Sequence, residues 1–254
     1  MNESLWIIKP FNGVFFVTLA CFALLLIAGT LLLRKRKERT RQLSVVIACV
    51  LTLAGFFVYK YFLSIDPQFK ELNGGFNWWD ELPLHLCNIN LILIPIAVLT
   101  RKKPLLGFCF FVGPLGALFA LIMPDSNFSG FSLLLPRMIG YYGTHFMVIV
   151  AALSLVTLRL YRPRFKDLPF AVIALAAVAL VVFGINALMR LTGVNPAANY
   201  FYTWEPLKGV GLLEMFYRWI PIPYLYMLPC IAIMTLYMVI VTIPFAIADG
   251  IRRK

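Results

Sequence analysis

Two short polar stretches within otherwise apolar sequence hold residue types that can perform acyl chemistry. The first runs from Asp80 to Asn90 and contains Glu81, His85, Cys87 and Asn88. A cysteine thiolate is a strong nucleophile, and a nearby imidazole can accept the thiol proton. A Cys–His pair can therefore carry an acyl group as a thioester.

The second polar stretch spaces Arg137, Tyr141 and His145 four residues apart, which places them on one face of a helix. The chain has two histidines, His85 and His145, and burying an imidazole among lipid tails for packing alone is costly. We therefore expect Cys87 to act as a nucleophile and His145 as its base, with His85 as a further catalytic residue. The alternative is that both histidines are hydrogen-bonded packing residues.

The remaining cysteines predict no further chemistry. They lie in apolar runs, where a thiol behaves as a small hydrophobic group: Cys21, Cys49, Cys109 and Cys230. An odd number of cysteines without a Cys-x-x-Cys spacing argues against a disulfide framework. The histidines and nearby carboxylates lack a metal-ligand spacing, and no glycine-rich phosphate motif occurs. We expect no metal, no cofactor and no nucleotide.

Composition places these residues in a membrane protein. Of 254 residues, 61% are apolar and 13% charged, and the mean hydropathy is +0.86, which exceeds what a soluble enzyme tolerates. A bilayer core needs about 20 apolar residues per helix, and in lipid each such run must be helical. The seven runs that fit are Gly13–Leu33, Leu43–Leu63, Glu81–Leu99, Leu105–Met123, Met138–Leu158, Leu168–Arg190 and Pro223–Ala248. The sequence predicts a single all-α, seven-helix integral membrane domain over residues 1–254.

Charge predicts the orientation of this bundle. Basic residues cluster in the connectors 34–41, 101–103 and 159–166 and in the tail 252–254. Cytoplasmic loops are enriched in Lys and Arg, so we expect an amino terminus outside and a carboxyl terminus in the cytoplasm of a multi-pass cell-membrane protein. All five tryptophans fall in segments assigned outside. Because the net charge of +12 comes mostly from these connectors, it does not indicate a nucleic-acid partner.

Helix direction predicts that the two polar stretches meet. The runs 81–99 and 138–158 both start at the outer side in this orientation. At about 1.5 Å per residue, Cys87 and His145 should each lie about 10 Å below that surface. The long connector 191–222 should cap the same end as a partly re-entrant lid.

Substrate contacts are expected around this pair. In the predicted helix Glu81 precedes His85 by one turn and should hold it. Arg137 and Arg190 should bind a lipid phosphate, for which a guanidinium is suited. Alternatively, these two arginines anchor helix ends at the membrane interface. Asn88 could likewise form a hydrogen bond to a neighbouring helix instead of binding substrate. The full set of expected binding residues is Glu81, Asn88, Arg137, Tyr141, Asn186, Arg190, Asn199 and Tyr200.

Several motifs at these positions resemble a known family. They are Leu82–Cys87, Met123–Asp125, His145, Asn199–Tyr200 with Glu205–Pro206, and Trp219–Tyr224. Over about Leu43 to Ile247 the chain is similar to the YwaF-like bacterial integral membrane proteins, which are relatives of the eukaryotic transmembrane protein 164 acyltransferases. The resemblance implies a seven-helix fold and phospholipid acyl transfer through a cysteine, which maps onto Cys87, with His145 as the matching histidine.

Three functions therefore remain open. An acyltransferase would take its acyl group from a membrane phospholipid and pass it to a lysophospholipid. With water as acceptor, the same Cys–His pair would make a lipid hydrolase. A non-enzymatic lipid or solute carrier, or a lipid-binding protein, would use the polar cluster without a reactive thiol. The sequence does not indicate an oligomeric state.

Overall fold

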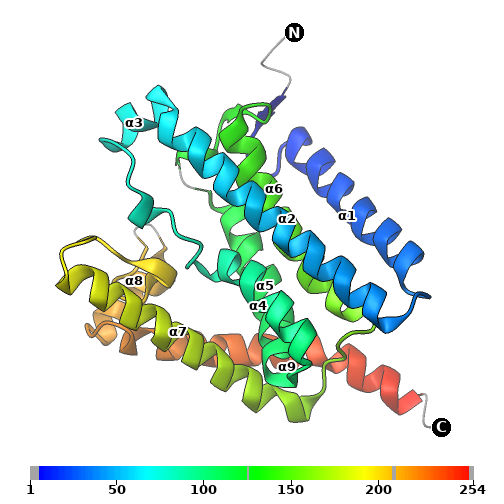
Figure 1. Cartoon of the computed structure of the whole chain (residues 1–254). Helices are drawn as coiled ribbons and strands as arrows, with labels where there is room; N and C mark the ends of the chain where they lie inside the picture. Colours follow the sequence, from blue (N-terminus) through cyan, green and yellow to red (C-terminus); the bar gives the residue numbers. More distant parts are fainter. Residues whose placement is uncertain (1–5, 125, 208–209, 252–254) are drawn as a thin grey trace.

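The computed structural model describes residues 6–124, 126–207 and 210–251, which form an almost entirely helical bundle (Figure 1). Asp125 and the basic tail 252–254 lie outside the described residues. The longer helices are α1 (Gly13–Leu33), α2 (Glu38–Ile65), α4 (Leu86–Thr100), α5 (Lys103–Ile122), α6 (Pro136–Thr157), α7 (Leu168–Leu191) and α9 (Leu228–Ile251).

Shorter elements lie in the connectors. They are β1 (Ile7–Ile8), α3 (Pro67–Asn73), the 3-10 turn η2 (Trp78–Asp80), η3 (Ser126–Phe128), β2 (Phe131–Ser132), η4 (Phe165–Asp167), η5 (Tyr200–Tyr202), α8 (Gly211–Trp219) and η6 (Leu225–Met227). The two strands pair antiparallel, with Ile7 opposite Ser132.

The predicted all-α polytopic membrane protein is confirmed, whereas the count of seven spans is not. Within the described residues, six helices are long and apolar enough to cross a bilayer: α1, α2, α5, α6, α7 and α9. The predicted run Glu81–Leu99 corresponds to α4, an apolar helix of 15 residues that is not among these six. At 1.5 Å per residue it extends about 22 Å, which is shorter than a typical hydrocarbon core.

The prediction of a helix over residues 81–99 was wrong at its amino-terminal end. Helix α4 begins at Leu86, and His85 is its N-cap with extended backbone angles of φ −71° and ψ 154°. Pro83 disfavours helical angles at the preceding residue and has no N–H to donate, so residues 81–85 form turns. Glu81 and His85 therefore do not share a helical face with Asn88.

Helix α6 lies at the centre of the bundle. It packs against α1, α2, α4 and α5, while α7 packs on the far side of α5 and contacts α9 (Figure 1). Large apolar side chains such as Phe108, Phe111 and Phe146 are fully buried between these helices. The outer faces of α1 and α9 expose leucines and isoleucines, as expected for surfaces that contact lipid tails.

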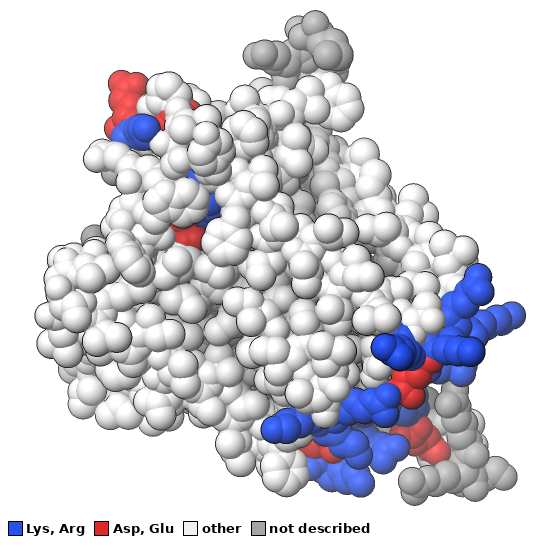
Figure 2. Space-filling model, in the orientation of Figure 1, with Lys and Arg blue, Asp and Glu red and all other residues white. Residues whose placement is uncertain are grey.

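Basic side chains gather at one end of the molecule. The α1–α2, α4–α5 and α6–α7 connectors contain them, and Figure 2 shows most of the blue surface at this end. The first turn of α4, the α3 and η2 segments and the α7–α9 connector lie toward the opposite end (Figure 1). We call the end with the basic connectors the basic end, and the end with the start of α4 and the α7–α9 connector the opposite end.

Gly140 provides a test of how α2 and α6 pack. A Cβ atom built there would lie 2.1 Å from Cγ of Tyr59, whereas one at Gly143 on the same helix would meet nothing within 4 Å. Gly140→Ala should therefore lower the free energy of unfolding by about 1–3 kcal/mol through overpacking, measured by denaturant titration in detergent micelles. Gly143→Ala is the control and should be neutral or stabilising. Equal stability of the two variants would contradict this packing.

Candidate active site

Cys87 and His145 lie in direct contact. Cys87 occupies the first turn of α4 and His145 the middle of α6, and both are buried. The Sγ atom of Cys87 lies 3.3 Å from Nε2 of His145, within hydrogen-bond distance for sulfur. The expected meeting of the two polar stretches is thus confirmed.

The other ring nitrogen of His145 determines what Nε2 can do. Nδ1 lies 2.7 Å from the backbone carbonyl oxygen of Tyr141. A carbonyl can only accept a hydrogen bond, so Nδ1 carries the proton in the neutral ring and Nε2 presents its lone pair. The thiol of Cys87 can therefore donate to Nε2, which is the arrangement that proton transfer from sulfur to a base requires.

Tyr141 holds the imidazole in place. Its ring packs 4.4 Å from that of His145, centroid to centroid, and stacks on Phe128 at 4.3 Å. Its hydroxyl donates to the carbonyl of Ala120 at 2.7 Å. The hydroxyl and the carbonyl of Tyr141 therefore both have protein partners, and its ring packs against the imidazole of His145.

The start of α4 favours negative charge at Cys87. The first N–H groups of a helix have no acceptor within that helix, and the helix dipole has its positive end there. Asn88, the next residue, is buried, and its Oδ1 has no hydrogen-bond partner within the described chain. This helix start thus offers backbone donors beside the sulfur and one unsatisfied acceptor.

Lys60 is a buried charged residue near the site that the sequence motifs did not predict. It lies in α2 and forms a buried ion pair with Glu81, and its Nζ lies 4.7 Å from the ring centroid of Tyr59. The ion pair places a positive charge beside the turns that lead into α4. A single lysine within the apolar run 43–63 was the available signal, because charged groups in membrane helices are rarely placed there without a role.

The prediction that Glu81 holds His85 was wrong. Glu81 pairs with Lys60 instead of holding His85 one helical turn away. The ring of His85 packs between Tyr200 at 5.1 Å and Tyr202 at 5.5 Å, measured between centroids. His85 thus belongs to the surface of the site that the α7–α9 connector covers.

A cavity of about 240 Å³ lies at this opposite end. It is lined by Asp80, His85, Asn195, Ala198, Asn199, Tyr200 and Tyr202. Cys87 and His145 are not among its lining residues. Cys87 is 7% exposed, so a substrate reaching its sulfur requires the covering side chains to move.

The α7–α9 connector is tied to the rest of the site by hydrogen bonds, as a cap over this end requires. Asn186 of α7 donates to the carbonyl of Tyr200 and accepts from its N–H, at 2.8 and 3.0 Å. The hydroxyl of Tyr200 donates to the carbonyl of Trp79 and accepts from the N–H of Leu82. Burial raises the pKa of Tyr200, so the hydroxyl keeps the proton that it donates.

Asn199 and the two expected phosphate-binding arginines also have partners inside the protein. Asn199 accepts from the N–H groups of Trp204 and Glu205. Arg137 is 2% exposed and donates to Asp66 and Gln68 at 3.1 and 2.9 Å. Arg190 donates to the carbonyl of Ala198 and lies 3.7 Å from Glu205. In this structure these groups hold connectors in place.

Comparison with known proteins assigns the chain to a family. The model of the TMEM164 family matches residues 7–242, which include both polar stretches and the connector that covers them. The chain belongs to the TMEM164 family. No curated protein and no solved structure matches the chain. With its six long apolar helices, the family match supports a multi-pass membrane protein.

Membership of the TMEM164 family suggests a relation to lipid acyltransferases. The Cys87–His145 contact is compatible with that chemistry, because it pairs a nucleophile with an oriented base. Among the described residues, no three His, Cys, Asp or Glu side chains cluster as metal ligands.

The Lys60–Glu81 pair provides a second test. Its side chains are 9% and 19% exposed, against 65% and 50% for the pair between Arg101 and Glu38. Glu81→Gln leaves a buried ammonium uncompensated and should lower the free energy of unfolding by about 3 kcal/mol, with most of the loss recovered in Lys60→Met/Glu81→Gln. Glu38→Gln, the exposed control, should cost less than about 1 kcal/mol. Denaturant titration in detergent measures the free energy of unfolding of all three variants. Equal destabilisation by Glu81→Gln and Glu38→Gln would contradict the buried ion pair.

Proposed function

We propose that this protein is an intramembrane phospholipid acyltransferase that forms an acyl-thioester on Cys87. The observation that carries the proposal is the 3.3 Å contact between Sγ of Cys87 and Nε2 of His145, with Nδ1 anchored on the carbonyl of Tyr141. The family match adds support, because it suggests a relation to lipid acyltransferases.

In the first half of the reaction, Nε2 of His145 accepts the thiol proton as Cys87 attacks the carbonyl carbon of a phospholipid ester. The tetrahedral intermediate then breaks its bond to the glycerol oxygen. His145 returns the proton to that oxygen, so a lysophospholipid leaves and the acyl group remains on sulfur as a thioester.

In the second half, a lysophospholipid hydroxyl takes the place of the departed alcohol. His145 accepts the hydroxyl proton while the oxygen attacks the thioester carbonyl. The carbon–sulfur bond breaks, the sulfur recovers the proton from His145, and a new phospholipid ester is released. Water in place of the lysolipid would give hydrolysis, so exclusion of water from the buried thioester favours transfer.

The oxyanion of each intermediate needs hydrogen-bond donors close to the sulfur. The free N–H groups of the first turn of α4 supply such donors, because Cys87 itself lies in that turn. His85 lies two residues before Cys87 and lines the cavity at the opposite end, from which it would orient the ester. Asn199 and Tyr200 line the same cavity and would contact the headgroup.

The proposal also includes the branch of the family, the number of membrane spans and their orientation. The Leu82–Cys87 motif supports the YwaF-like bacterial branch of this family. The basic connectors support a cell-membrane protein of seven spans, in which α4 completes the count and the basic end faces the cytoplasm. In that orientation the Cys–His pair takes its substrate from the outer leaflet.

A second candidate function rests on the cavity itself. Its lining includes His85 and two tyrosines but neither Cys87 nor His145, which is the arrangement of a lipid-binding protein or carrier that needs no reactive thiol. The two functions differ in whether Cys87 becomes acylated.

The proposed orientation predicts which loops react from outside the cell. Ala197 in the α7–α9 connector is exposed, as is Lys37 between α1 and α2. In a Cys21→Ser background, a membrane-impermeant maleimide should label Ala197→Cys on intact cells, and Lys37→Cys only after permeabilisation. The reverse pattern would overturn the amino-terminus-out orientation.

The proposed mechanism predicts a non-additive loss of activity. Cys87→Ala and His145→Gln should each lower acyl transfer between phospholipid and lysophospholipid by at least about 1,000-fold, and the double variant should lose no more than the worse single variant. Wild-type protein incubated with radiolabelled phospholipid should hold a hydroxylamine-sensitive acyl group that Cys87→Ala lacks.

Cys109→Ala is the matched control, because Cys109 is buried in α5 away from the site and should retain activity. Activity that persists in Cys87→Ala would show that the nucleophile is wrong. Lipid binding without acylation of the wild-type protein would favour the carrier.

A further inference from the structure

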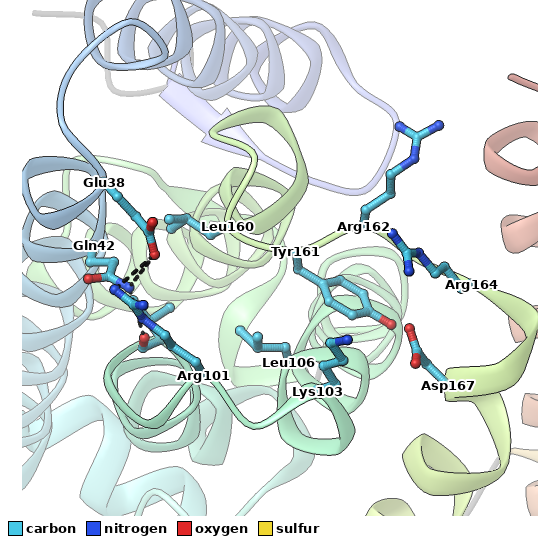
Figure 3. A pocket seen from close by; sticks show the side chains of 11 residues that line it. Glu38, Gln42, Arg101, Lys103, Leu106, Leu160, Tyr161, Arg162, Arg164 and Asp167 are labelled. Atoms are coloured by element: carbon cyan, nitrogen blue, oxygen red, sulfur yellow. Dashed lines mark hydrogen bonds and ion pairs between the residues drawn. The ribbon is translucent and has the colours of Figure 1, made fainter. Parts of the chain in front are cut away.

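A second cavity, of about 240 Å³, lies at the basic end of the bundle. It is enclosed by the start of α2, the end of α4, the start of α5 and the connector between α6 and α7 (Figure 3). Along α4, its lining residue Arg101 lies 14 residues after Cys87, a separation of about 21 Å at 1.5 Å per residue. This basic-end cavity is therefore separate from the Cys–His pair and belongs to no step of the proposed reaction.

Buried polar groups form the floor of the basic-end cavity. Gln42 and Asp167 are buried there, and Tyr161 is 6% exposed. The hydroxyl of Tyr161 points toward Asp167 (Figure 3) but has no hydrogen-bond partner within the described chain. Burial, with the nearby Asp167, raises the pKa of Tyr161, so its hydroxyl keeps its proton. A buried hydroxyl without a hydrogen bond destabilises the protein, and a ligand that accepts from it would remove this cost.

Cationic side chains form the rim. Four line the cavity, namely Arg101, Lys103, Arg162 and Arg164, against the carboxylates of Glu38 and Asp167. Arg101 is paired with Glu38 at 3.0 Å, and Arg162 is paired with Asp249. In the part of the chain that the structure describes, no salt bridge joins Lys103 or Arg164 to a carboxylate. Among these described residues, the rim therefore carries two cations without a salt bridge, Lys103 and Arg164, and the floor has an unsatisfied donor.

We propose that the basic-end cavity binds a phosphate group, that of a membrane phospholipid headgroup. Lys103 and Arg164 supply charge-assisted hydrogen bonds to the phosphate oxygens, and the hydroxyl of Tyr161 donates to one of them. The carboxylate of Asp167 accepts from a hydroxyl of the same headgroup. Basic pockets between membrane helices are established binding places for anionic lipids.

The apolar part of the lining fits a lipid better than a free anion. Val98, Leu106 and Leu160 also line the cavity, and such apolar side chains suit the glycerol and the first methylene groups of an acyl chain. The excess of positive over negative side chains disfavours a metal cation. The exposed basic residues of the three connectors would raise the local concentration of anionic lipid by electrostatic attraction.

Native mass spectrometry of the full-length protein in detergent tests this site with three probes. They are a phosphatidylglycerol, a glucosyl diacylglycerol with the same acyl chains but no phosphate, and inorganic phosphate. Wild-type protein should retain phosphatidylglycerol in preference to the glycolipid, with weaker competition by inorganic phosphate. Lys103→Gln/Arg164→Gln should weaken phosphatidylglycerol binding at least about tenfold, and Tyr161→Phe about fivefold.

Two controls keep the result specific. Arg36→Gln/Arg39→Gln removes two exposed charges from the same end but outside the cavity lining, and should change binding less than twofold. Cys87→Ala should bind as wild type, because this site does not depend on the proposed acyl transfer. The site would be overturned if both double variants weakened phosphatidylglycerol binding equally. It would also be overturned if Tyr161→Phe and Lys103→Gln/Arg164→Gln bound this lipid as the wild type does. Competition by inorganic phosphate as strong as that by the lipid would overturn the lipid assignment.

Discussion

A polar side chain enclosed among apolar helices must find a partner within the protein, because lipid tails supply none. This constraint accounts for most of the polar contacts in the bundle. Lys60 is stabilised by Glu81, Arg137 by Asp66, and the imidazole of His145 by the carbonyl of Tyr141. The first two pairings tie α2 and α6 to neighbouring connectors, and the third orients the imidazole within α6. The buried polar groups therefore hold the connectors and orient the candidate site.

Helix α6 carries out much of this organisation because it contacts four other helices. Gly140 lets Tyr59 of α2 approach its backbone closely, and His145, five residues later in α6, contacts Cys87 of α4. The same α2 helix places Lys60 beside the start of α4. A nucleophile on α4, a base on α6 and a cation on α2 thus converge because these three helices pack against one another.

The two ends of the bundle are built differently. At the opposite end, the α7–α9 connector is held by Asn186 and Tyr200 and covers the reactive pair. At the basic end, short connectors leave a cavity with a cationic rim and the unsatisfied hydroxyl of Tyr161. Because the ends are separated by the length of α4, chemistry at one end and lipid phosphate binding at the other can be tested independently.

The membrane class, the helical fold and the pairing of Cys87 with His145 could all be predicted from the sequence. Composition and apolar run length are set by the bilayer, and helix direction then places two residues at equal depth. Sequence reasoning failed at Glu81, where Pro83 keeps the chain out of the helix, and it overlooked Lys60, whose partner lies 21 residues away in another segment. Partner choice among buried charges depends on side-chain positions in three dimensions, which periodicity does not encode. Only the tertiary structure could therefore decide which polar groups hold the fold and which are left for a ligand.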